Sequence, residues 1–455
     1  MRILLWHGYL LSGSGSNIYT ANVARAWRAQ GHDVLVLCQD RAANLLSFVD
    51  EDGDFDDGND RLVTVPTPGR SGAGRCRVAR PNIGGLLPVY VRDEYEGFEV
   101  KTFVELSDDE LDAYTQSNVK ALVTAIDTFD PHAIITGHEV MGPYIAKLAC
   151  GPLDRHFVAK LHGSALEYAV KVQDRYRTFA TEGLAAAERV VGGSRYMVAE
   201  ASRVVPGWES NAIVINPGCD VDLFKPNSTT AITDVPQLGF VGKLIAAKGV
   251  QDFLAALPLV ERAPLEVTVV GFGSFQPELE DMAASLMRGD IESARKAVGN
   301  DPLVASAARF LETAGSARPY TEAAKKQTIR FTGPLTHGPL AELLPSFDLL
   351  VVPSVVPEAF GMVAAEAAAC GVLPVVPRHS GIGEVGAAIE AELSQPGLVT
   401  FDPLKVPGSI AEVIDRVLAL PIATRREMGT AIRRLAEREW SWDRVAQRLL
   451  ATAAG

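Results

Sequence analysis

The stretch Pro357–Gly371 reads PEAFGMVAAEAAACG and follows closely on the apolar run Leu349–Val352. A short apolar run, a loop that opens with a carboxylate and an alanine-rich segment predict a buried strand, a loop and a helix. We expect the helix to begin near Phe360–Met362, which puts Glu366 on its second turn. Such units build parallel sheets that helices cover on both faces. The stretch therefore predicts an α/β fold.

The same alternation of short apolar runs and helix-length segments continues along most of the chain. In a first set, the predicted strands are Arg2–Leu5, Asp33–Cys38, Ala133–Thr136, Phe157–Leu161, Arg189–Val191 and Ile213–Ile215. In a second set, they are Gln237–Val241, Glu266–Val270, Thr328–Phe331, Leu349–Val352, Leu373–Val376 and Leu398–Phe401. Two successive sets predict two doubly wound, Rossmann-like domains. We place the hinge near Pro217–Pro226, which carries no helical period.

Length, charge and cysteine usage narrow the class of protein. With 455 residues, the chain exceeds what one hydrophobic core usually organises. A formal net charge of −13 argues against a nucleic-acid partner, since phosphate-backbone binding needs a basic surface. The five scattered cysteines form no CxxC pair, which argues against a zinc site and indicates a reducing compartment. The N-terminus lacks a signal-peptide pattern and no apolar stretch predicts a transmembrane segment, so we expect a cytoplasmic protein.

Three segments interrupt the strand–helix rhythm. The acidic run Asp50–Asp60 predicts a solvated loop; a calcium loop is the alternative, but Gly and Glu are missing from its sixth and twelfth positions. The Gly- and Arg-rich segment Thr67–Pro81 predicts either a mobile surface loop or a grip on an anionic acceptor. The segment Gln276–Lys326 predicts helices packed on the second domain. Oligomerisation and covering of a cleft both remain open as its role.

Two carboxylates flank the predicted helix start in PEAFGMVAAE. A helix N-terminus presents free N–H groups and a partial positive charge, which suit sugar hydroxyls and a diphosphate. Glu358 in the loop and Glu366 in the helix can each hold a polyol, one on either side of the phosphates. The alanines around Glu366 indicate a closely packed helix, which argues against an ordinary surface position.

The run Leu238–Val250, LGFVGKLIAAKGV, places two lysines after a predicted strand that ends at Gly242. Strand carboxyl ends face the ligand crevice in sheets of this kind. Lys243 and Lys248 are spaced so that both ammonium groups can reach one point, where they would neutralise a diphosphate. Each charge-assisted contact would contribute about 1.5–3 kcal/mol.

Glycines and histidines follow the predicted strands of the first domain. In LSGSGSNIYT, Gly13 and Gly15 allow close backbone approach before a helix, although the spacing is not the dinucleotide fingerprint GxGxxG. His162 in LHGS follows an apolar strand and can face a transferred sugar or an acceptor. His138 in TGHEVMGP occupies a similar strand end, and His7 is the weakest of these three candidates.

Together these motifs resemble the large retaining glycosyltransferase family 4, whose GT-B fold has two facing Rossmann-like doubly wound domains and a C-terminal crossover helix. The resemblance runs over most of the chain. It includes the glycine loop, His162-Gly163, GKLIAAKG, the GFG turn and EAFGMVAAE. It also includes NPGCDVDLF at Asn216–Phe224 and WSWDRVAQRLL at Trp440–Leu450. The implied domains are residues 1–216, with a crossover helix at about 437–455, on the acceptor side and residues 217–436 on the donor side.

The resemblance also implies roles for individual residues. Lys243 and Lys248 would bind the donor diphosphate, Glu358 the hydroxyls of the transferred sugar, and Glu366 the nucleotide ribose. For catalysis the candidates are His162, Lys243, Lys248 and Glu358; for the donor Gly13, Gly15, Gly242, Gly271, Gly273, Leu335, Phe360, Gly361, Met362, Val363 and Glu366; and for the acceptor His138, Arg75 and Arg77. The family attacks from the front face, so no side chain is expected as an essential base. No metal and no cofactor are implied, since the nucleotide-sugar is a substrate.

Other classes of protein also agree with parts of the sequence. A dinucleotide-binding oxidoreductase would use Gly13–Gly15 but leaves the lysine and carboxylate pairs unexplained. A nucleotide-sugar epimerase or a phosphorylase of the same fold would change the reaction, and a silent sugar-nucleotide sensor would lack turnover. UDP is the family's commonest nucleotide, with GDP and ADP open. The sequence does not identify the acceptor, a small molecule or a glycan, or decide whether the chain forms a homo-oligomer.

Overall fold

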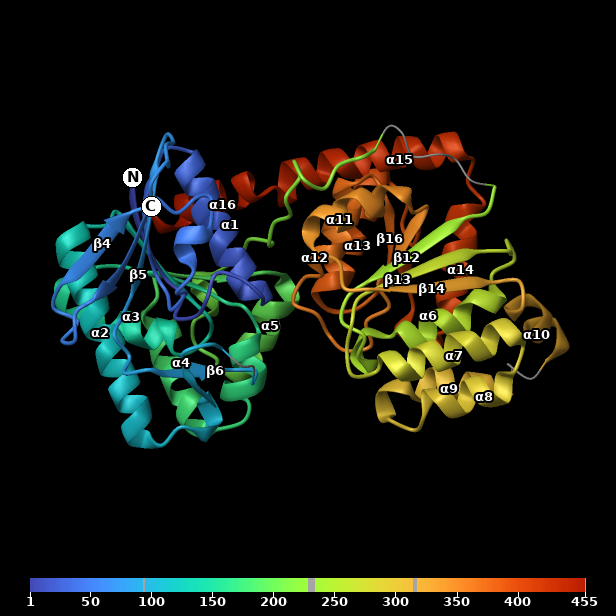
Figure 1. Cartoon of the computed structure of the whole chain (residues 1–455), viewed down its shortest axis with the longest axis horizontal. Coiled ribbons are helices and arrows are strands. Elements are labelled where there is room, and N and C mark those ends of the chain that lie inside the picture. The colour runs from blue at the N-terminus through green and yellow to red at the C-terminus, as the bar shows by residue number, and fades with distance from the viewer. Residues whose placement is uncertain (93–94, 228–233, 314–316, 455) are drawn as a thin grey trace. The chain divides into compact units, whose positions relative to one another are not determined.

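The computed structural model describes residues 1–92, 95–227, 234–313 and 317–454 (Figure 1). The chain divides into two compact units, unit 1 with Met1–Pro217 and Trp442–Gly455, and unit 2 with Gly218–Ser441. The hinge predicted near Pro217–Pro226 contains this boundary. The segment expected to return to the first domain at about residue 437 does so at Trp442, because residues up to Ser441 belong to unit 2.

Within the described residues, unit 1 is built on a nine-stranded sheet. Its strands are β1 (Arg2–Trp6), β2 (Asp33–Leu37), β3 (Glu51–Phe55), β4 (Leu62–Pro66), β5 (Arg75–Arg80), β8 (Ala133–Gly137), β9 (Val158–Lys160), β10 (Arg189–Gly192) and β11 (Ala212–Val214). The order is β11-β10-β9-β8-β1-β2-β5-β3-β4, and β4 runs antiparallel to β3. The chain changes direction across the sheet between β1 and β8, which pair in parallel. Ligands bind at the carboxyl ends of strands at such a switch point.

The two charged segments predicted as loops each contain a strand, so the loop prediction was wrong for Glu51–Phe55 and for Arg75–Arg80, while residues 56–60 and 67–74 lie outside strands. β3 lies inside the acidic run Asp50–Asp60, and β5 lies inside the arginine-rich run Thr67–Pro81. The two strands pair in parallel, with Asp54 opposite Arg80. Arg80 forms ion pairs with Asp52 and Asp54, the latter at 2.6 Å. The acidic and basic runs neutralise one another across the sheet, which a reading of each run by itself could not reveal.

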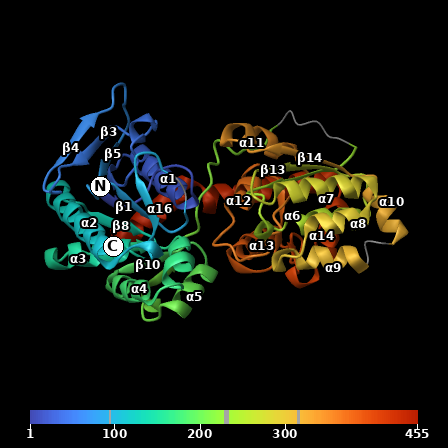
Figure 2. The same cartoon turned by 60° about the horizontal axis from the view of Figure 1, so that its bottom comes forward.

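Helices cover both faces of the unit 1 sheet. They are α1 (Gly15–Ala29), α2 (Asp108–Phe129), α3 (Gly142–Cys150), α4 (Asp174–Ala186), α5 (Arg195–Val204) and α16 (Trp442–Ala453). The C-terminal helix α16 lies beside α1 (Figures 1 and 2), and Trp27 Nε1 donates to Ala446 O at 2.8 Å. On the other face, Trp6 Nε1 donates to Asn118 Oδ1 on α2 at 3.0 Å. A small two-stranded sheet, β6 (Leu86–Val89) with β7 (Glu99–Thr102), lies outside the main one.

The sheet of unit 2 has the Rossmann strand order. Its strands are β12 (Gln237–Val241), β13 (Glu266–Val270), β14 (Thr328–Gly333), β15 (Leu349–Val351), β16 (Leu373–Pro377) and β17 (Thr400–Phe401). They pair in parallel in the order β14-β13-β12-β15-β16-β17. This is the doubly wound order, with its switch point between β12 and β15. The predicted strands of this unit agree with the observed ones to within two residues.

Helices also cover both faces of the unit 2 sheet. They are α6 (Val250–Ala256), α7 (Gln276–Arg288), α8 (Ile291–Val298), α9 (Ala305–Thr313), α10 (Arg318–Ala324), α11 (His337–Leu343), α12 (Met362–Ala369), α13 (Ser380–Leu393), α14 (Gly408–Leu418) and α15 (Ile422–Leu435). The predicted helical segment Gln276–Lys326 forms α7 to α10, which pack next to one another and to α6 (Figure 1). Helices α12 and α13 pack against α15. Fully buried side chains such as Phe253 and Leu350 form the core between sheet and helices.

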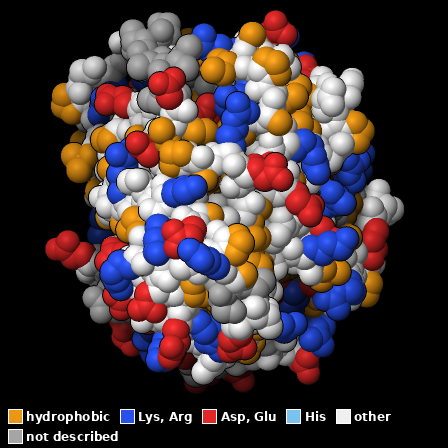
Figure 3. Space-filling view, turned by 90° about the vertical axis from the view of Figure 1, so that its right-hand side faces the viewer, with side chains coloured by type: hydrophobic (Ala, Val, Ile, Leu, Met, Phe, Trp, Pro, Cys, Tyr) orange, Lys and Arg blue, Asp and Glu red, His pale blue; other side chains and the backbone are white. Residues whose placement is uncertain are grey.

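One face of the molecule carries charges of both signs side by side. On the face shown in Figure 3, Lys and Arg side chains lie among Asp and Glu side chains, which differs from the continuous basic surface that nucleic-acid binders present. Among the described residues, every helix is too short or too polar to cross a membrane.

Candidate active site

At the carboxyl edge of the unit 2 sheet, glycine loops follow β12 and β13, next to the switch point between β12 and β15. Gly271 adopts φ 147°, and a Cβ built on it would lie 1.8 Å from Gly242 O. Gly273 is similarly close to the backbone, with a built Cβ 2.3 Å from Leu244 O. Leu244 N donates to Phe272 O at 2.8 Å, which ties the two loops together. Glycine is therefore required at 271 and 273 because two backbone segments pack closely there, and this requirement does not depend on a ligand.

Lys248 and Glu358 meet across the same switch point. Lys248 lies at the end of a short 3₁₀ turn after β12, and Glu358 lies in the loop after β15. Lys248 Nζ lies 2.7 Å from Glu358 Oε1, and the two side chains are 30% and 15% exposed. Gly249 permits this turn with φ 73°, where a built Cβ would lie 1.9 Å from Pro353 O. The fold thus brings two of the predicted catalytic residues into direct contact.

Three further polar residues, which sequence reasoning missed, fix Glu358 in place. Ser354 donates its hydroxyl to Glu358 Oε1, and Glu358 N donates to Ser380 Oγ at 3.0 Å. His379 contacts both of these serines, through Ser380 Oγ and Ser354 O, at 3.0 Å each. The available signal was the sequence RHSG directly after the apolar strand that became β16. Glu358 is therefore a positioned hydrogen-bond acceptor with its charge partly compensated.

Lys243 is placed differently from Lys248. Its side chain is exposed and makes no hydrogen bond or ion pair within the described residues. Lys243 therefore does not share the Glu358 contact, and its ammonium group is available to an anion. Leu335, expected on the nucleotide side, is half-buried after β14 and packs against the core of unit 2.

The predicted helix after Glu358 is α12, and Glu366 lies on it as expected. Glu366 is half-buried among alanines, and burial raises the pKa of its carboxyl to about 7. Gly361 at the helix start has φ 95°, a conformation that favours glycine. Phe360, also predicted to contact the donor, has a side chain that is 3% exposed and packs edge-on against Trp440 at 6.0 Å, so any contact with a donor would come from its backbone.

Met362 and Val363, the other predicted donor contacts on α12, are only partly available. Both side chains are half-buried and pack against the hydrophobic core of unit 2. They lie on the first turn of α12, where backbone N–H groups have no partner within the helix. Any contact they make with a donor would therefore come mainly from the backbone.

In unit 1, three histidines gather at the carboxyl edge of the sheet, near the switch point. The His138 and His162 rings lie 4.9 Å apart, and His7 stacks on His138 at 5.6 Å. Burial lowers the pKa of His7 to about 4, so its ring is neutral near pH 7. Its Nε2 faces Asn17 Oδ1 at 2.9 Å and its Nδ1 faces Thr20 Oγ1 at 3.1 Å. Burial also lowers the pKa of His138 and of His162 well below the ordinary value. The structure therefore places His138 and His162, both predicted site residues, next to His7, which was the weakest of the three candidates.

The glycine loop before α1 contributes backbone and is open. Gly13 has φ 91° with nothing within 4 Å of a built Cβ. Gly15 is the first residue of α1, which Ser14 caps by accepting from Asn17 N. Asp40, the acid nearest the end of β2, accepts from Leu11 N and Ala42 N at 2.9 and 2.8 Å. Its carboxylate is thus engaged with the backbone, which does not favour the dinucleotide alternative.

The two arginines predicted for the acceptor do not join this group. Arg75 and Arg77 lie in β5 opposite Asp33 and Leu35 of β2, at the amino end of the strands. Arg77 is paired with Asp33 at 2.8 Å, and Arg75 is paired with Glu51. Both guanidinium groups lie away from the carboxyl edge, so the prediction that they join the acceptor site is corrected.

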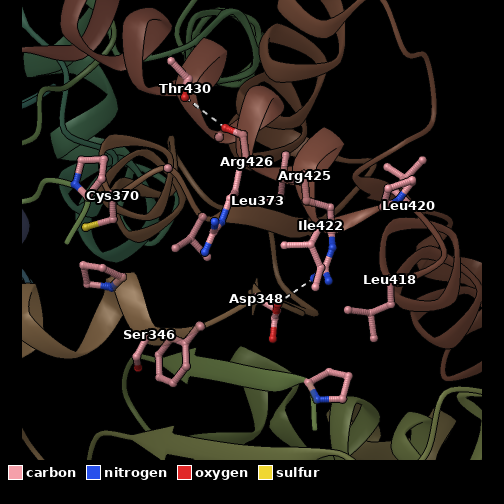
Figure 4. Close-up of a pocket in the computed structure, with 18 of the residues that line it drawn as sticks. Ser346, Asp348, Cys370, Leu373, Leu418, Leu420, Ile422, Arg425, Arg426 and Thr430 are labelled. Carbon is pink, nitrogen blue, oxygen red and sulfur yellow. Dashed lines mark hydrogen bonds and ion pairs between the residues drawn. The ribbon is translucent and has the colours of Figure 1, made fainter. Parts of the chain in front are cut away.

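A separate cavity of about 670 Å³ lies at the amino edge of the unit 2 sheet. Figure 4 shows Arg425 bonded to Asp348, the residue before β15, with Arg426 extending toward Leu373. Because Lys248 and Glu358 follow the carboxyl ends of the strands, this cavity is distinct from their site. Among the described residues, no cluster of three or more His, Cys, Asp or Glu side chains is arranged to hold a metal ion.

Two family models match the chain. Residues 14–218 match the glycosyl transferase 4-like domain, and residues 318–435 match the glycosyl transferases group 1. The first match covers nearly all of unit 1 before its C-terminal helix, and the second covers the half of unit 2 that contains Glu358 and Glu366.

Individual relatives agree with these matches. The chain is 28% identical over 318 residues to the D-inositol 3-phosphate glycosyltransferase of Geodermatophilus obscurus, covering 65% of this chain and 59% of the relative. It is 31% identical over 235 residues to glycogen synthase of Mycobacterium tuberculosis, covering 51% and 46%. The matches thus span less than two thirds of these relatives. The crystal structure of HepE from Anabaena in complex with UDP superposes with a TM-score of 0.62 at 15% identity, covering 99% of each chain.

Proposed function

Because the chain belongs to the group 1 glycosyltransferases with a 4-like N-terminal domain and has the GT-B fold, we propose that it transfers a hexosyl group from a nucleotide diphosphate sugar to an acceptor with retention of anomeric configuration. A UDP-sugar is the favoured donor and a GDP-sugar the alternative. The UDP bound to the structurally similar HepE supports this preference. The single observation that carries the proposal is the Lys248–Glu358 contact at the switch point of unit 2.

The donor site we propose uses the charges of unit 2. Lys243 and Lys248 would neutralise the diphosphate, aided by the free N–H groups at the start of α12. Glu358 would accept hydrogen bonds from hydroxyls of the transferred sugar, and Glu366 from the nucleotide ribose. Removing one such preorganised contact typically lowers the rate about 10²–10³-fold.

Retention by front-face attack is part of the proposal and is taken from the family that the sequence resembles. Glu358 Oε1 accepts from Lys248 and Ser354, which agrees with a carboxylate that binds hydroxyls and does not itself decide the stereochemistry. In the step we propose, the bond between the anomeric carbon and the diphosphate oxygen breaks, and the acceptor oxygen bonds to that carbon on the same face. The acceptor proton ends on the departing phosphate. No separate catalytic base is required.

Metal independence and a cytoplasmic location are further parts of the proposal. The two lysines supply positive charge that a metal ion would otherwise bring to the diphosphate. All five cysteines are free and buried, which fits a reducing compartment. The names of the two relatives point to different acceptor classes, a phosphorylated cyclitol and a glucan, so they do not fix the acceptor.

The first test is thermal unfolding with UDP, GDP, ADP and NAD, each with and without EDTA. A nucleotide at about 100 times its Kd should add about 2.7 kcal/mol to the free energy of unfolding. We expect UDP to stabilise the wild type equally with EDTA, and Lys243→Ala to reduce the shift while Lys405→Ala does not. Stabilisation by NAD alone would instead favour the oxidoreductase, and loss of the UDP shift in EDTA would contradict metal independence.

The second test is the configuration of the product. With a UDP-α-hexose as donor, proton NMR of the anomeric signal should report an α-linked product. A β-linked product would rule out retention. Release of an epimerised nucleotide-sugar, with no transfer, would favour the epimerase alternative.

A further inference from the structure

The cavity at the amino edge of the unit 2 sheet lies outside the donor site proposed above. Its volume is about 670 Å³, and small-molecule sites in proteins have volumes of about 300–1,000 Å³. Its lining includes Asp348, which precedes β15, and Leu373, which begins β16. Lys248 and Glu358 follow the opposite, carboxyl ends of the strands. A molecule in this cavity would therefore leave the space of the nucleotide diphosphate free.

Three arginines line this cavity, Arg262, Arg425 and Arg426. Arg425 is held in place, because its Nη1 donates to Asp348 Oδ1 at 2.6 Å and its side chain is only 15% exposed. Asp348 is fixed in turn, since its Oδ2 accepts from Gln237 N at 2.9 Å. Arg425 and Asp348 therefore form a wall of the cavity in which the two charges compensate one another.

The charges of Arg262 and Arg426 are not compensated in this way. Both side chains are exposed, and within the described residues neither forms an ion pair. Arg262 donates to the neutral carbonyl oxygen of Leu418, and the Arg426 guanidinium makes no hydrogen bond in the described part of the chain. Figure 4 shows Arg426 extending toward Leu373, which also lines the cavity. Against these two cations, the described lining sets one further carboxylate, that of Asp234.

Accessible apolar side chains lie beside these cations. Leu420, which is half-buried, and Ile422, which is 43% exposed, border the cavity between the end of α14 and the start of α15. An inorganic anion would use the cations alone, whereas this apolar surface allows an organic group to be buried together with the anion. The first turn of α15 carries no acidic residue and no side-chain cap, so the helix start adds a partial positive charge to that of the arginines.

We propose that this cavity binds a phosphate monoester of a small organic molecule, with the phosphate on Arg262 and Arg426 and the organic group against Leu420 and Ile422. A guanidinium group binds phosphate oxygens through two parallel N–H···O bonds. A phosphate monoester carries a charge of about −1.5 to −2 at pH 7, which matches two uncompensated cations better than a single carboxylate does. This site is additional to the nucleotide-sugar site and does not depend on transfer of a sugar.

The test is isothermal titration calorimetry on the full chain, with and without saturating UDP. The probes are glucose 6-phosphate and AMP, their neutral counterparts glucose and adenosine, and inorganic phosphate. We expect at least one ester to bind in the presence of UDP, more tightly than inorganic phosphate and than its neutral counterpart. Binding of neither ester, or equal affinity for the esters and inorganic phosphate, would overturn the proposal. A chain that binds an ester but not UDP would contradict the proposed function and support this site.

Single substitutions locate the bound ester. Arg426→Gln should weaken its binding roughly ten- to hundredfold, since a charged hydrogen-bond donor is removed, and should leave Tm unchanged because the guanidinium has no partner in the described chain. Arg262→Gln should weaken binding to a similar extent. Arg434→Gln is the matched control, since Arg434 is also exposed and unpaired among the described residues but lies on the last turn of α15, outside the cavity lining. Equal ester affinities of the Arg426 and Arg434 variants would refute the proposal, and an ester that UDP also displaces would then belong to the donor site.

Discussion

Replacing Lys248 by Met tests whether the Lys248–Glu358 contact contributes to folding as well as to donor binding. An exposed ion pair contributes about 0–1 kcal/mol, and removing one partner of a fully buried pair costs about 3–5 kcal/mol. Side chains that are 30% and 15% exposed lie between these limits, and Ser354 still donates to Glu358. We therefore expect Lys248→Met to lower the free energy of unfolding of unit 2 by about 1–3 kcal/mol. For a unit of this size, Tm should fall by roughly 2–12 °C.

The assay is differential scanning calorimetry, in which the transition that UDP raises is assigned to unit 2. Lys296→Met is the matched control, since Lys296 and Glu292 also lie 2.7 Å apart but are 73% and 81% exposed, and it should cost less than about 0.5 kcal/mol. Adding Glu358→Gln to Lys248→Met should cost little more, because the carboxylate charge has already lost its cation. Equal effects of the Lys248 and Lys296 variants, or additive effects of the pair, would refute the reasoning.

Two further predictions follow from single sites in unit 2. Because the raised pKa of Glu366 is about 7, its contribution to stability is largest below the unfolded pKa of about 4.5 and is lost as pH rises through 7. If the ionised form of Glu366 accepts hydrogen bonds from ribose hydroxyls, the UDP affinity measured by calorimetry should rise between about pH 6 and pH 8. A rise of the same size in the Glu366→Gln variant would come from the titration of UDP itself and would contradict this role. Gly249→Ala should lower the free energy of unfolding by about 1–3 kcal/mol more than Gly397→Ala. Both glycines have positive φ, but only Gly249 has a backbone oxygen, Pro353 O, in the way of a Cβ; equal Tm values for the two variants would show that this clash is relieved.

The sequence identified the apolar strands because their signal is local. Gln237–Val241 and Glu266–Val270 were predicted with the bounds that the structure has, since each is a short run flanked by turn residues. β3 and β5 were missed because their residues are charged and their stability comes from pairing with each other. A charged run by itself looks solvated, and the register that joins Arg80 to Asp52 and Asp54 is a long-range property.

For the candidate site too, the sequence predicts some features and only the structure shows the others. The positions of Lys248, Glu358 and His162 after strand ends follow from the sequence, because parallel strands bring their carboxyl ends to one edge. The position of Glu366 on the helix after Glu358 follows from the alanine-rich run. Their roles in binding and catalysis remain predictions. Spacing along the chain does not separate Lys248, which contacts Glu358, from Lys243, which is exposed. It also placed Arg77 with the acceptor residues, although the fold pairs it with Asp33.

By itself, then, the sequence determined the α/β class, the two-domain order and the edge of each sheet that carries polar residues. Only the tertiary structure decided which charged side chains form ion pairs. It also decided that the Phe360 side chain belongs to the core and that Glu139 Oε2 has no hydrogen-bond partner within the described residues. The physical reason is that periodicity and turn chemistry act over a few residues, whereas burial and pairing depend on segments distant in the chain. The gathering of His7, His138 and His162 is visible only when β1, β8 and β9 are assembled, because the end of each strand contributes one ring.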